Sequence, residues 1–171
     1  MSVSSSHRNT ITKLVILASL ILLLVGVMYL VLIASSKTLA CRENLARIYQ
    51  SLEMYELAHG SLPRLAFFAE EPRSDSESIC VVLESYGLSP ETFVCPSAHP
   101  LVAKTGLSYI WNTRLNGRSM QDFYEKQWML VEIEAISLDV NFPHFGACQV
   151  LYTDGSIERM RNPAGVLNGW P

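Results

Sequence analysis

The feature that most constrains this chain is an uninterrupted apolar run near its amino terminus. Residues 14–34 read LVILASLILLLVGVMYLVLIA and contain no charged side chain, with Lys13 and Lys37 on either side. About 20 apolar residues in a helix are enough to cross a bilayer. A cleaved secretory signal has a shorter apolar region, of about 7–15 residues. The run therefore predicts a retained transmembrane helix after a short tail at residues 1–13. A buried helix of a soluble protein is the alternative.

The helical pattern continues beyond this run, through residues 35–60. No proline occurs before Pro63, and His59-Gly60 just ahead of it is typical of a helix end. Apolar side chains recur here at alternating steps of four and three, which places them on one face of a helix. They are Cys41, Leu45, Ile48, Leu52 and Tyr55. One helix from about Thr12 to His59 would be about 70 Å long at 1.5 Å per residue, and this stripe predicts an apolar packing partner.

The remaining residues, 61–171, have the mixed pattern of a small head. Residues 61–78 are rich in Pro, Glu, Ser and Arg and predict an exposed connection. Residues 77–86 predict a short helix that ends at Gly87, a residue type favoured after helix ends. Aromatic and β-branched residues predict strands at 108–112 and 128–134.

Two more strands are expected at 148–153 and 156–160, because they flank Asp154-Gly155, a strong hairpin signal. The expected fold class is therefore α+β. A long amino-terminal helix carries an amphipathic continuation that packs on a small antiparallel sheet.

This predicted hairpin also contains residue types found in catalytic sites, since His144 and Cys148 precede Asp154 closely. A strand over 145–153 would hold His144 and Asp154 about 30 Å apart at roughly 3.3 Å per residue. They could share a proton or a metal only if the chain bent sharply near Gly146. Asp-Gly is also what a tight turn requires, because Gly adopts left-handed backbone angles freely. We interpret the segment as a hairpin and not as a catalytic dyad.

The cysteines at 41, 80, 95 and 148 leave several pairings open. A disulfide between Cys80 and Cys95 would close a loop of about 15 residues and would stabilise the fold by about 3 kcal/mol. Alternatively, both are unpaired core residues, or they bind zinc with His99 and Cys148. No Cys-x-x-Cys pair is present, and that spacing is what makes a zinc prediction strong. Cys80–Cys95 is thus a candidate disulfide, and no metal or cofactor is expected.

Other chemistry has little support in the sequence. There is no Gly-x-Ser-x-Gly, glycine-rich phosphate loop or His-Glu-x-x-His motif. Strand alternation predicts that Glu132 and Glu134 face solvent. The net charge of −3 offers no basic field for nucleic acid. We therefore expect no catalytic residues, no nucleic-acid partner and no small-molecule ligand.

The order of these segments resembles that of pilin-like proteins. The helix CRENLARIYQSLEMYELAHGSLP precedes FVCPS, the strand WMLVEIE and the closing HFGACQVLYTDGSIERM. This order is similar to that of type II secretion pseudopilin relatives with a His, nine residues and then Asp-Gly, abundant in planctomycete and verrucomicrobial bacteria. The motif residues are His144, Asp154 and Gly155, and the resemblance covers residues 41–160 in outline.

This resemblance implies a non-enzymatic structural subunit of a type II secretion or type IV pilus-like system. Such a subunit crosses the inner (cytoplasmic) membrane once and keeps its head, here residues 61–171, in the periplasm. Its partners would be the bilayer and other pilin-like subunits, which associate through their apolar helices. Charge alone does not settle the orientation of this chain. A membrane-tethered binding module that does not polymerise is the alternative, and a metalloenzyme using Cys95, His99 and Cys148 is a third.

One feature departs from the prepilin pattern. Prepilins carry a glycine at a cleavage point and a glutamate five residues further on, whereas SHRNTITKLVIL enters the apolar run with neither. Relatives without that glutamate are minor or tip subunits. We expect either such a subunit or a permanently anchored protein with the same fold.

Overall fold

The computed structural model of this chain describes residues 3–136 and 142–161, with side chains from Thr10 onward. The chain divides into two compact units, Met1–Ser36 and Lys37–Pro171. Helix α1 runs from Val3 to His59 and supplies residues to both. It ends where expected, before Gly60, but it begins well before Thr12, so most of the expected tail at 1–13 is helical.

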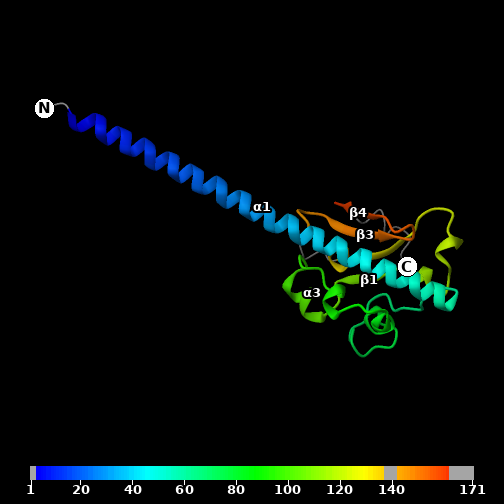
Figure 1. Cartoon of the computed structure of the whole chain (residues 1–171). Helices are drawn as coiled ribbons and strands as arrows, with labels where there is room; N and C mark the ends of the chain where they lie inside the picture. The colour runs from blue at the N-terminus through cyan, green and yellow to red at the C-terminus, as the bar shows by residue number, and fades with distance from the viewer. Residues whose placement is uncertain (1–2, 137–141, 162–171) are drawn as a thin grey trace. The chain divides into compact units, whose positions relative to one another are not determined.

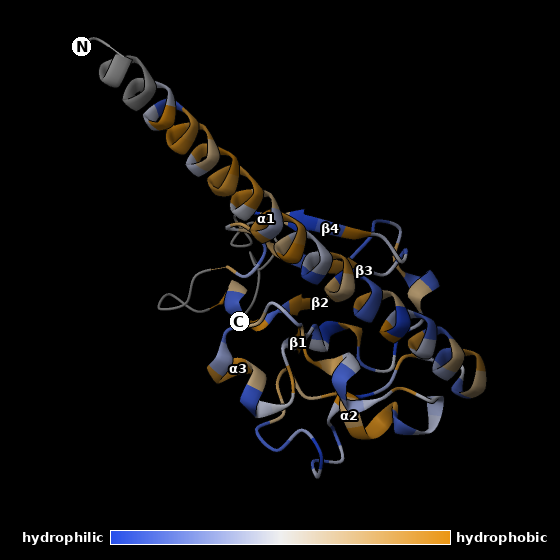
Figure 2. Cartoon of the chain, turned by 60° about the vertical axis from the view of Figure 1, so that its left-hand side comes forward, coloured by the Kyte–Doolittle hydropathy of each residue, from blue (hydrophilic) through white to orange (hydrophobic). Residues whose placement is uncertain are grey.

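The first unit is the apolar part of α1. In the described part of the chain, one helix is long and apolar enough to cross a membrane, and its most apolar stretch has no buried residues. Figure 2 shows hydrophobic residues on successive turns of this part of the helix, and nearly all of its large apolar side chains from Leu14 to Ile33 are exposed. A helix that is apolar on every side needs an apolar environment on every side. The expected long apolar helix is therefore confirmed.

The second unit is built on a four-stranded antiparallel sheet with the order β1-β2-β3-β4. The strands are β1 Tyr109–Trp111, β2 Trp128–Glu132, β3 Cys148–Tyr152 and β4 Ile157–Met160. All four lie within the segments expected to be strands. The second is shorter than expected, because the chain turns into the 3-10 helix η5, Ile133–Ala135, directly after Glu132.

The α1 residues of this unit pack across one face of the sheet (Figure 1). The stripe residues Cys41, Leu45, Ile48 and Leu52 are fully buried, and Tyr55 is partly buried. They form one core with sheet residues, among them Tyr109, Trp111, Leu130 and Leu151. The helical stripe and one face of the sheet are thus two halves of the same core, as expected for an α+β, pilin-like fold.

The opposite face of the sheet is also covered, which corrects one expectation. Ile110, Val131 and Val150 form a second core, against which Phe67 and Phe68 pack. Trp111 N also donates to Phe67 O at 2.8 Å, so this segment lies along the β1 edge. Residues 61–78 are therefore not simply an exposed connection. Their scattered apolar residues, including the buried Leu62, Leu65 and Ala69, fold inward despite polar neighbours.

Short helices complete this unit. Two of them replace the single helix expected at 77–86: α2 Ile79–Val82, capped by Ser78, and η1 Glu84–Tyr86, which ends at Gly87 in the left-handed region. The others are η2 Pro90–Phe93, α3 Pro100–Thr105, η3 Thr113–Leu115 and η4 Met120–Asp122.

Candidate functional site

A buried polar cluster lies between the sheet and α1, centred on Glu132 and His144. His144 Nε2 lies 2.6 Å from Glu132 Oε1, and neither side chain has any exposed surface. Burial raises the pKa of Glu132, while the hydrogen bond and charge of His144 oppose that shift. A carboxylate out of water is costly unless it is paired and hydrogen-bonded, so His144 is the partner that makes this burial possible.

Two further residues, Thr38 and Gln149, hold the pair in place and are hydrogen-bonded to each other. The second oxygen of Glu132 accepts from Gln149 N at 3.0 Å. The second ring nitrogen of His144, Nδ1, lies 3.1 Å from Thr38 Oγ1 on α1. Gln149 Nε2 donates to Thr38 O at 2.9 Å, so α1, β2 and β3 all contribute to one network. Both ring nitrogens of His144 and both carboxylate oxygens of Glu132 therefore have a hydrogen-bond partner.

A sharp bend in the backbone brings His144 into the core. Phe145 and Gly146 both have positive φ, 52° and 75°, and His144 N donates to Ala147 O. Arg159 on β4 donates through Nη2 to His144 O, which fixes the bend from the other strand. The bend turns the residue before β3 back toward α1. The chain does bend near Gly146, which was the condition for His144 to leave the line of the strand. The bend brings His144 to Glu132, however, and not to Asp154.

The expectation that Glu132 and Glu134 face solvent is wrong. Both are fully buried. Alternation does place Glu132 on the same face as Leu130, but that face is covered by α1 and not by water. Glu134 lies in η5, where its Oε1 accepts from His99 N at 3.0 Å. A polar residue at the end of a strand is a poor guide to exposure when both faces of the sheet are covered.

The candidate disulfide is also corrected. Cys95 is bonded to Cys41 on α1, 54 residues away, with a Cα–Cα distance of 5.0 Å. Cys80 and Cys148 remain as thiols. Cys41 is the first residue of the buried stripe, and the loop before α3 brings Cys95 against it. This bond therefore ties the helix to the head, whereas a bond to Cys80 would have closed only a local loop.

The residues considered as alternative zinc ligands, Cys80, Cys95, His99 and Cys148, are not brought together. Cys148 belongs to the opposite face of the sheet, with Val131 and Val150. His99 is exposed and caps α3, its Nδ1 accepting from Leu101 N at 3.3 Å. Burial raises the pKa of the Cys80 thiol, and it raises that of Cys148 to about 12. Both thiols are therefore poor nucleophiles, because the thiolate is the reactive form.

The Asp154-Gly155 turn has the expected hairpin geometry. Asp154 Oδ1 accepts from Ser156 N and Ser156 Oγ, and the latter bond is the first cause of a lowered Asp154 pKa. Gly155 has φ +77°, and a β-carbon added there would lie 2.9 Å from the ring of Tyr49 on α1. In the described residues no hydrogen bond joins Asp154 to His144. The interpretation as a hairpin is confirmed, and the turn also docks on the helix.

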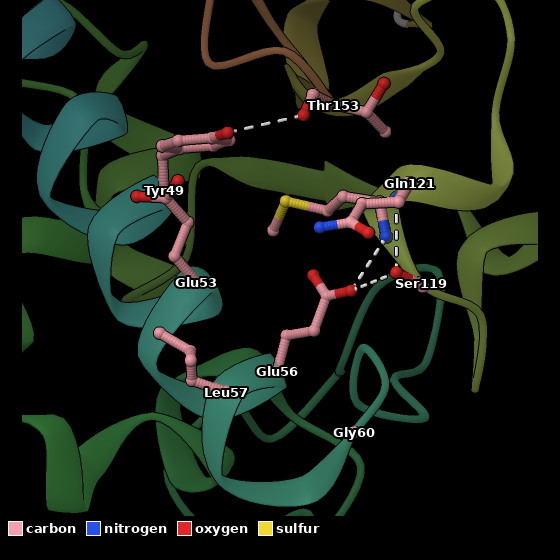
Figure 3. Close-up of a pocket in the computed structure, with 9 residues that line it drawn as sticks. Tyr49, Glu53, Glu56, Leu57, Gly60, Ser119, Gln121 and Thr153 are labelled. Carbon is pink, nitrogen blue, oxygen red and sulfur yellow. Dashed lines mark hydrogen bonds between the residues drawn. The ribbon is translucent and has the colours of Figure 1, made fainter.

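An open pocket of about 650 Å³ lies beside this contact (Figure 3). Tyr49 OH donates to Thr153 O at 3.3 Å, and its pKa is raised to about 12, first by burial and then by Glu53. Glu56 Oε1 accepts from Ser119 Oγ at 2.5 Å and from Met120 N at 3.0 Å. These bonds connect the end of α1 to the loop around η4 and to the hairpin, so most polar groups here already have structural partners.

Sequence reasoning missed Thr38, Glu132 and Gln149 and the pairing of Cys41. The sequence did contain one signal for the pairing of Cys41, because this residue lies on the stripe that was expected to face the sheet. No protein-family model, no curated protein and no solved structure matches this chain. What the structure shows is a pilin-like architecture, a long apolar helix followed by a small antiparallel sheet, whose head encloses a buried Glu–His pair and a disulfide.

Proposed function

We propose that this protein is a membrane-anchored, pseudopilin-like structural subunit of a secretion or pilus-like system, with its head outside the cytoplasm. It has no catalytic role in this proposal. It anchors through the apolar part of α1 and associates with other pilin-like subunits through the same helix.

The contrast between the two parts of α1 carries this proposal. Large apolar side chains before residue 34 are exposed, as with Leu22 at 72 % and Leu24 at 65 %. Further along the helix, Leu45 and Ile48 are fully buried against the sheet. Burying apolar surface is worth roughly 25 cal/mol per Å², so the exposed part requires lipid or neighbouring helices. In this proposal, lipid surrounds the helix of a structural subunit before assembly, and neighbouring helices surround it afterwards.

The chemistry inside the head agrees with this role. Its buried Glu–His pair has no exposed surface, so a substrate does not reach it in this conformation. Its disulfide is of the kind that persists in oxidising compartments outside the cytoplasm. Both features rigidify a head and neither supplies a reaction.

Membrane anchoring is tested by a matched pair of double variants. Arginine near the centre of a membrane helix costs roughly 2.5–3.5 kcal/mol, so Leu22→Arg/Val25→Arg should leave the carbonate-resistant membrane fraction. Met54→Arg/Leu57→Arg places the same charges on exposed positions of α1 outside the run and should stay in it. Retention of the first variant in the membrane would contradict anchoring by this segment.

Assembly is tested separately. Cells that express the full chain are sheared mildly, and the released material is sedimented and probed for this protein. High-mass fibres are expected for a filament subunit. The intact mass of the membrane form, measured in parallel, shows whether the amino-terminal residues have been removed by a peptidase.

The alternative function, a tethered binding module, is favoured by one observation, the open pocket between Tyr49, Glu56 and Ser119 (Figure 3). Its carboxylates, Glu53 and Glu56, suit a cationic group on a partner. A protein that remains monomeric in the membrane after shearing, and whose partner capture is lost on Glu53→Gln, would support this function over the first.

A further inference from the structure

The buried cluster contains four possible metal ligands, two of which are joined as a disulfide in the oxidised protein. One ligand atom from each of Cys41, Cys95, Glu132 and His144 lies within 4.8 Å of all the others, and all four residues are buried. Two cysteine sulfurs, an imidazole nitrogen and a carboxylate oxygen are all ligands that Zn²⁺ accepts in tetrahedral sites. Tetrahedral bond lengths place such atoms roughly 3.3–3.8 Å apart. His144 Nε2 already lies 3.4 Å from Cys95 Sγ, whereas its 2.6 Å separation from Glu132 Oε1 has to widen by roughly 0.7 Å for both atoms to bind one ion.

The orientation of the imidazole is the one that a metal site requires. Nε2 of His144 faces both Glu132 Oε1 and Cys95 Sγ, while Nδ1 is directed away toward Thr38 Oγ1. Metal-binding histidines generally have their other ring nitrogen held by such an outer partner, which fixes the ring. Here Thr38 provides that partner, and it lies on the same helix as Cys41.

The carboxylate is arranged in the same way. Glu132 directs Oε1 into the cluster, while Oε2 accepts from Gln149 N at 3.0 Å. The site therefore has an inner set of four ligand atoms and an outer set of hydrogen bonds that orient two of them. Four separate segments converge on it, namely α1, the residues around 95, β2 and the bend before β3, and all four ligand residues are buried.

We propose that the reduced protein binds one Zn²⁺ ion through Cys41, Cys95, Glu132 and His144, so that a metal cross-link replaces the disulfide at the same place in the fold. A dithiol reductant supplies two electrons and two protons. The Sγ–Sγ bond breaks, two thiols form, and the reductant becomes a disulfide. Zn²⁺ then binds two thiolates, the carboxylate and the neutral imidazole, and three protons leave to the medium: one from each thiol and the one held between His144 Nε2 and Glu132 Oε1.

This site gives the head a cross-link between α1 and the Cys95 loop in either redox state. A reduced cluster without metal would leave two thiols beside a buried carboxylate, whereas bound Zn²⁺ offsets three negative charges with two positive ones. Metal binding of this kind is coupled to folding, so the ion is expected to enter as the head folds and not through a preformed channel. The inference is independent of whether the protein forms filaments.

The experiment uses the full chain in detergent. The protein is unfolded, reduced with dithiothreitol, desalted without oxygen and refolded with ZnCl₂, and the metal content is measured after a second desalting. About one Zn²⁺ per chain is expected for the reduced protein, and essentially none for the oxidised protein treated in the same way. Refolding with Co²⁺ instead should produce the near-ultraviolet absorption of thiolate-bound cobalt in the unmodified sequence.

The ligands are assigned with variants and with a footprint. His144→Asn should lower the zinc affinity by more than the 10–100-fold typical of an outer partner, and Thr38→Val should lower it within that range. Cys80→Ala should retain zinc, because Cys80 is not part of the cluster. In the wild-type chain, zinc should slow the alkylation of Cys41 and Cys95 but not that of Cys80.

Two results would overturn the proposal. One is a reduced, refolded wild-type chain with no retained zinc and no thiolate–cobalt absorption. The other is zinc that protects Cys80 or Cys148 from alkylation and leaves Cys41 and Cys95 reactive, which would locate the metal elsewhere. The footprint and the cobalt spectrum both use the native sequence, so a variant that does not fold leaves the proposal fully testable.

Discussion

His144 Nε2 and Glu132 Oε1 are 2.6 Å apart between the sheet and α1, and both side chains are completely buried. Glu132 is the last residue of β2 and His144 precedes β3, and the bend at Phe145 and Gly146 brings the two together. The histidine of the His-x9-Asp-Gly motif is thus a core residue that compensates a buried carboxylate. The aspartate and glycine of the same motif make a turn elsewhere, so the motif marks two structural positions and not one site.

Removing one member of this pair should be costly. His144→Ala leaves Glu132 buried without its partner, and breaking a buried ion pair in this way costs roughly 3–5 kcal/mol. The free energy of unfolding is measured by denaturant titration of the full chain in detergent, with the disulfide intact.

Glu158→Gln is the matched control, because Glu158 lies on β4 of the same sheet and forms an exposed ion pair with Lys126. Surface pairs are worth about 0–1 kcal/mol. Replacing both buried residues, Glu132→Leu/His144→Leu, should recover part of the loss, since no unpaired charge remains. A His144→Ala variant as stable as Glu158→Gln would contradict the buried pair.

The Gly155 position should tolerate no side chain. Gly155→Ala places a β-carbon 2.9 Å from the Tyr49 ring and also forces alanine to φ +77°. Gly87→Ala is a close control, since it has the same φ of +77° and nothing within 4 Å. Overpacking typically costs about 1–3 kcal/mol, so Gly155→Ala should be less stable than Gly87→Ala by about that amount. Adding Tyr49→Ala should narrow the difference, and equal stabilities would show that the turn is not held against α1.

The Cys41–Cys95 bond should account for much of the stability of the head. It joins residues 54 apart, and the chain-entropy model assigns a closed loop of that size about 4 kcal/mol. Cys41→Ala/Cys95→Ala in metal-free buffer should lose about this amount, whereas Cys80→Ala should change stability by less than about 1 kcal/mol. Proteolysis without reduction should release one linked pair of peptides containing Cys41 and Cys95. A linked pair containing Cys80 would contradict this arrangement.

The stability of the head should decrease at alkaline pH partly through Cys148. Burial raises its pKa from 9.0 to about 12, so above pH 9 the unfolded chain releases this proton while the folded chain retains it. The contribution of this thiol to the free energy of unfolding is therefore fully present below pH 9. It is lost as the pH rises toward 12, by at most about 1.4 kcal/mol per pH unit. Other groups titrate in the same range, so the measured quantity is the difference between wild type and Cys148→Ala at each pH. A difference that does not change with pH would contradict the buried thiol.

Much of the architecture could be predicted because it depends on local patterns. The run at 14–34 determines an apolar helix through its length and composition alone. The stripe from Cys41 to Leu52 follows from helical periodicity, and Asp154-Gly155 marks a turn because few residues adopt its backbone angles. Each of these signals lies within one segment and needs no knowledge of the rest of the chain.

What only the tertiary structure decided is which segments meet. Alternation put Glu132 and Leu130 on one face, but whether water or α1 covers that face depends on the packing of distant elements. The partner of Cys95 depends on which loop approaches α1, whereas the spacing along the chain only suggested Cys80, through a closed loop of about 15 residues. By itself the sequence determined the apolar helix, the stripe and the hairpin. Folding decided the cluster of Cys41, Cys95, Glu132 and His144, because its contacts join residues that no local period relates.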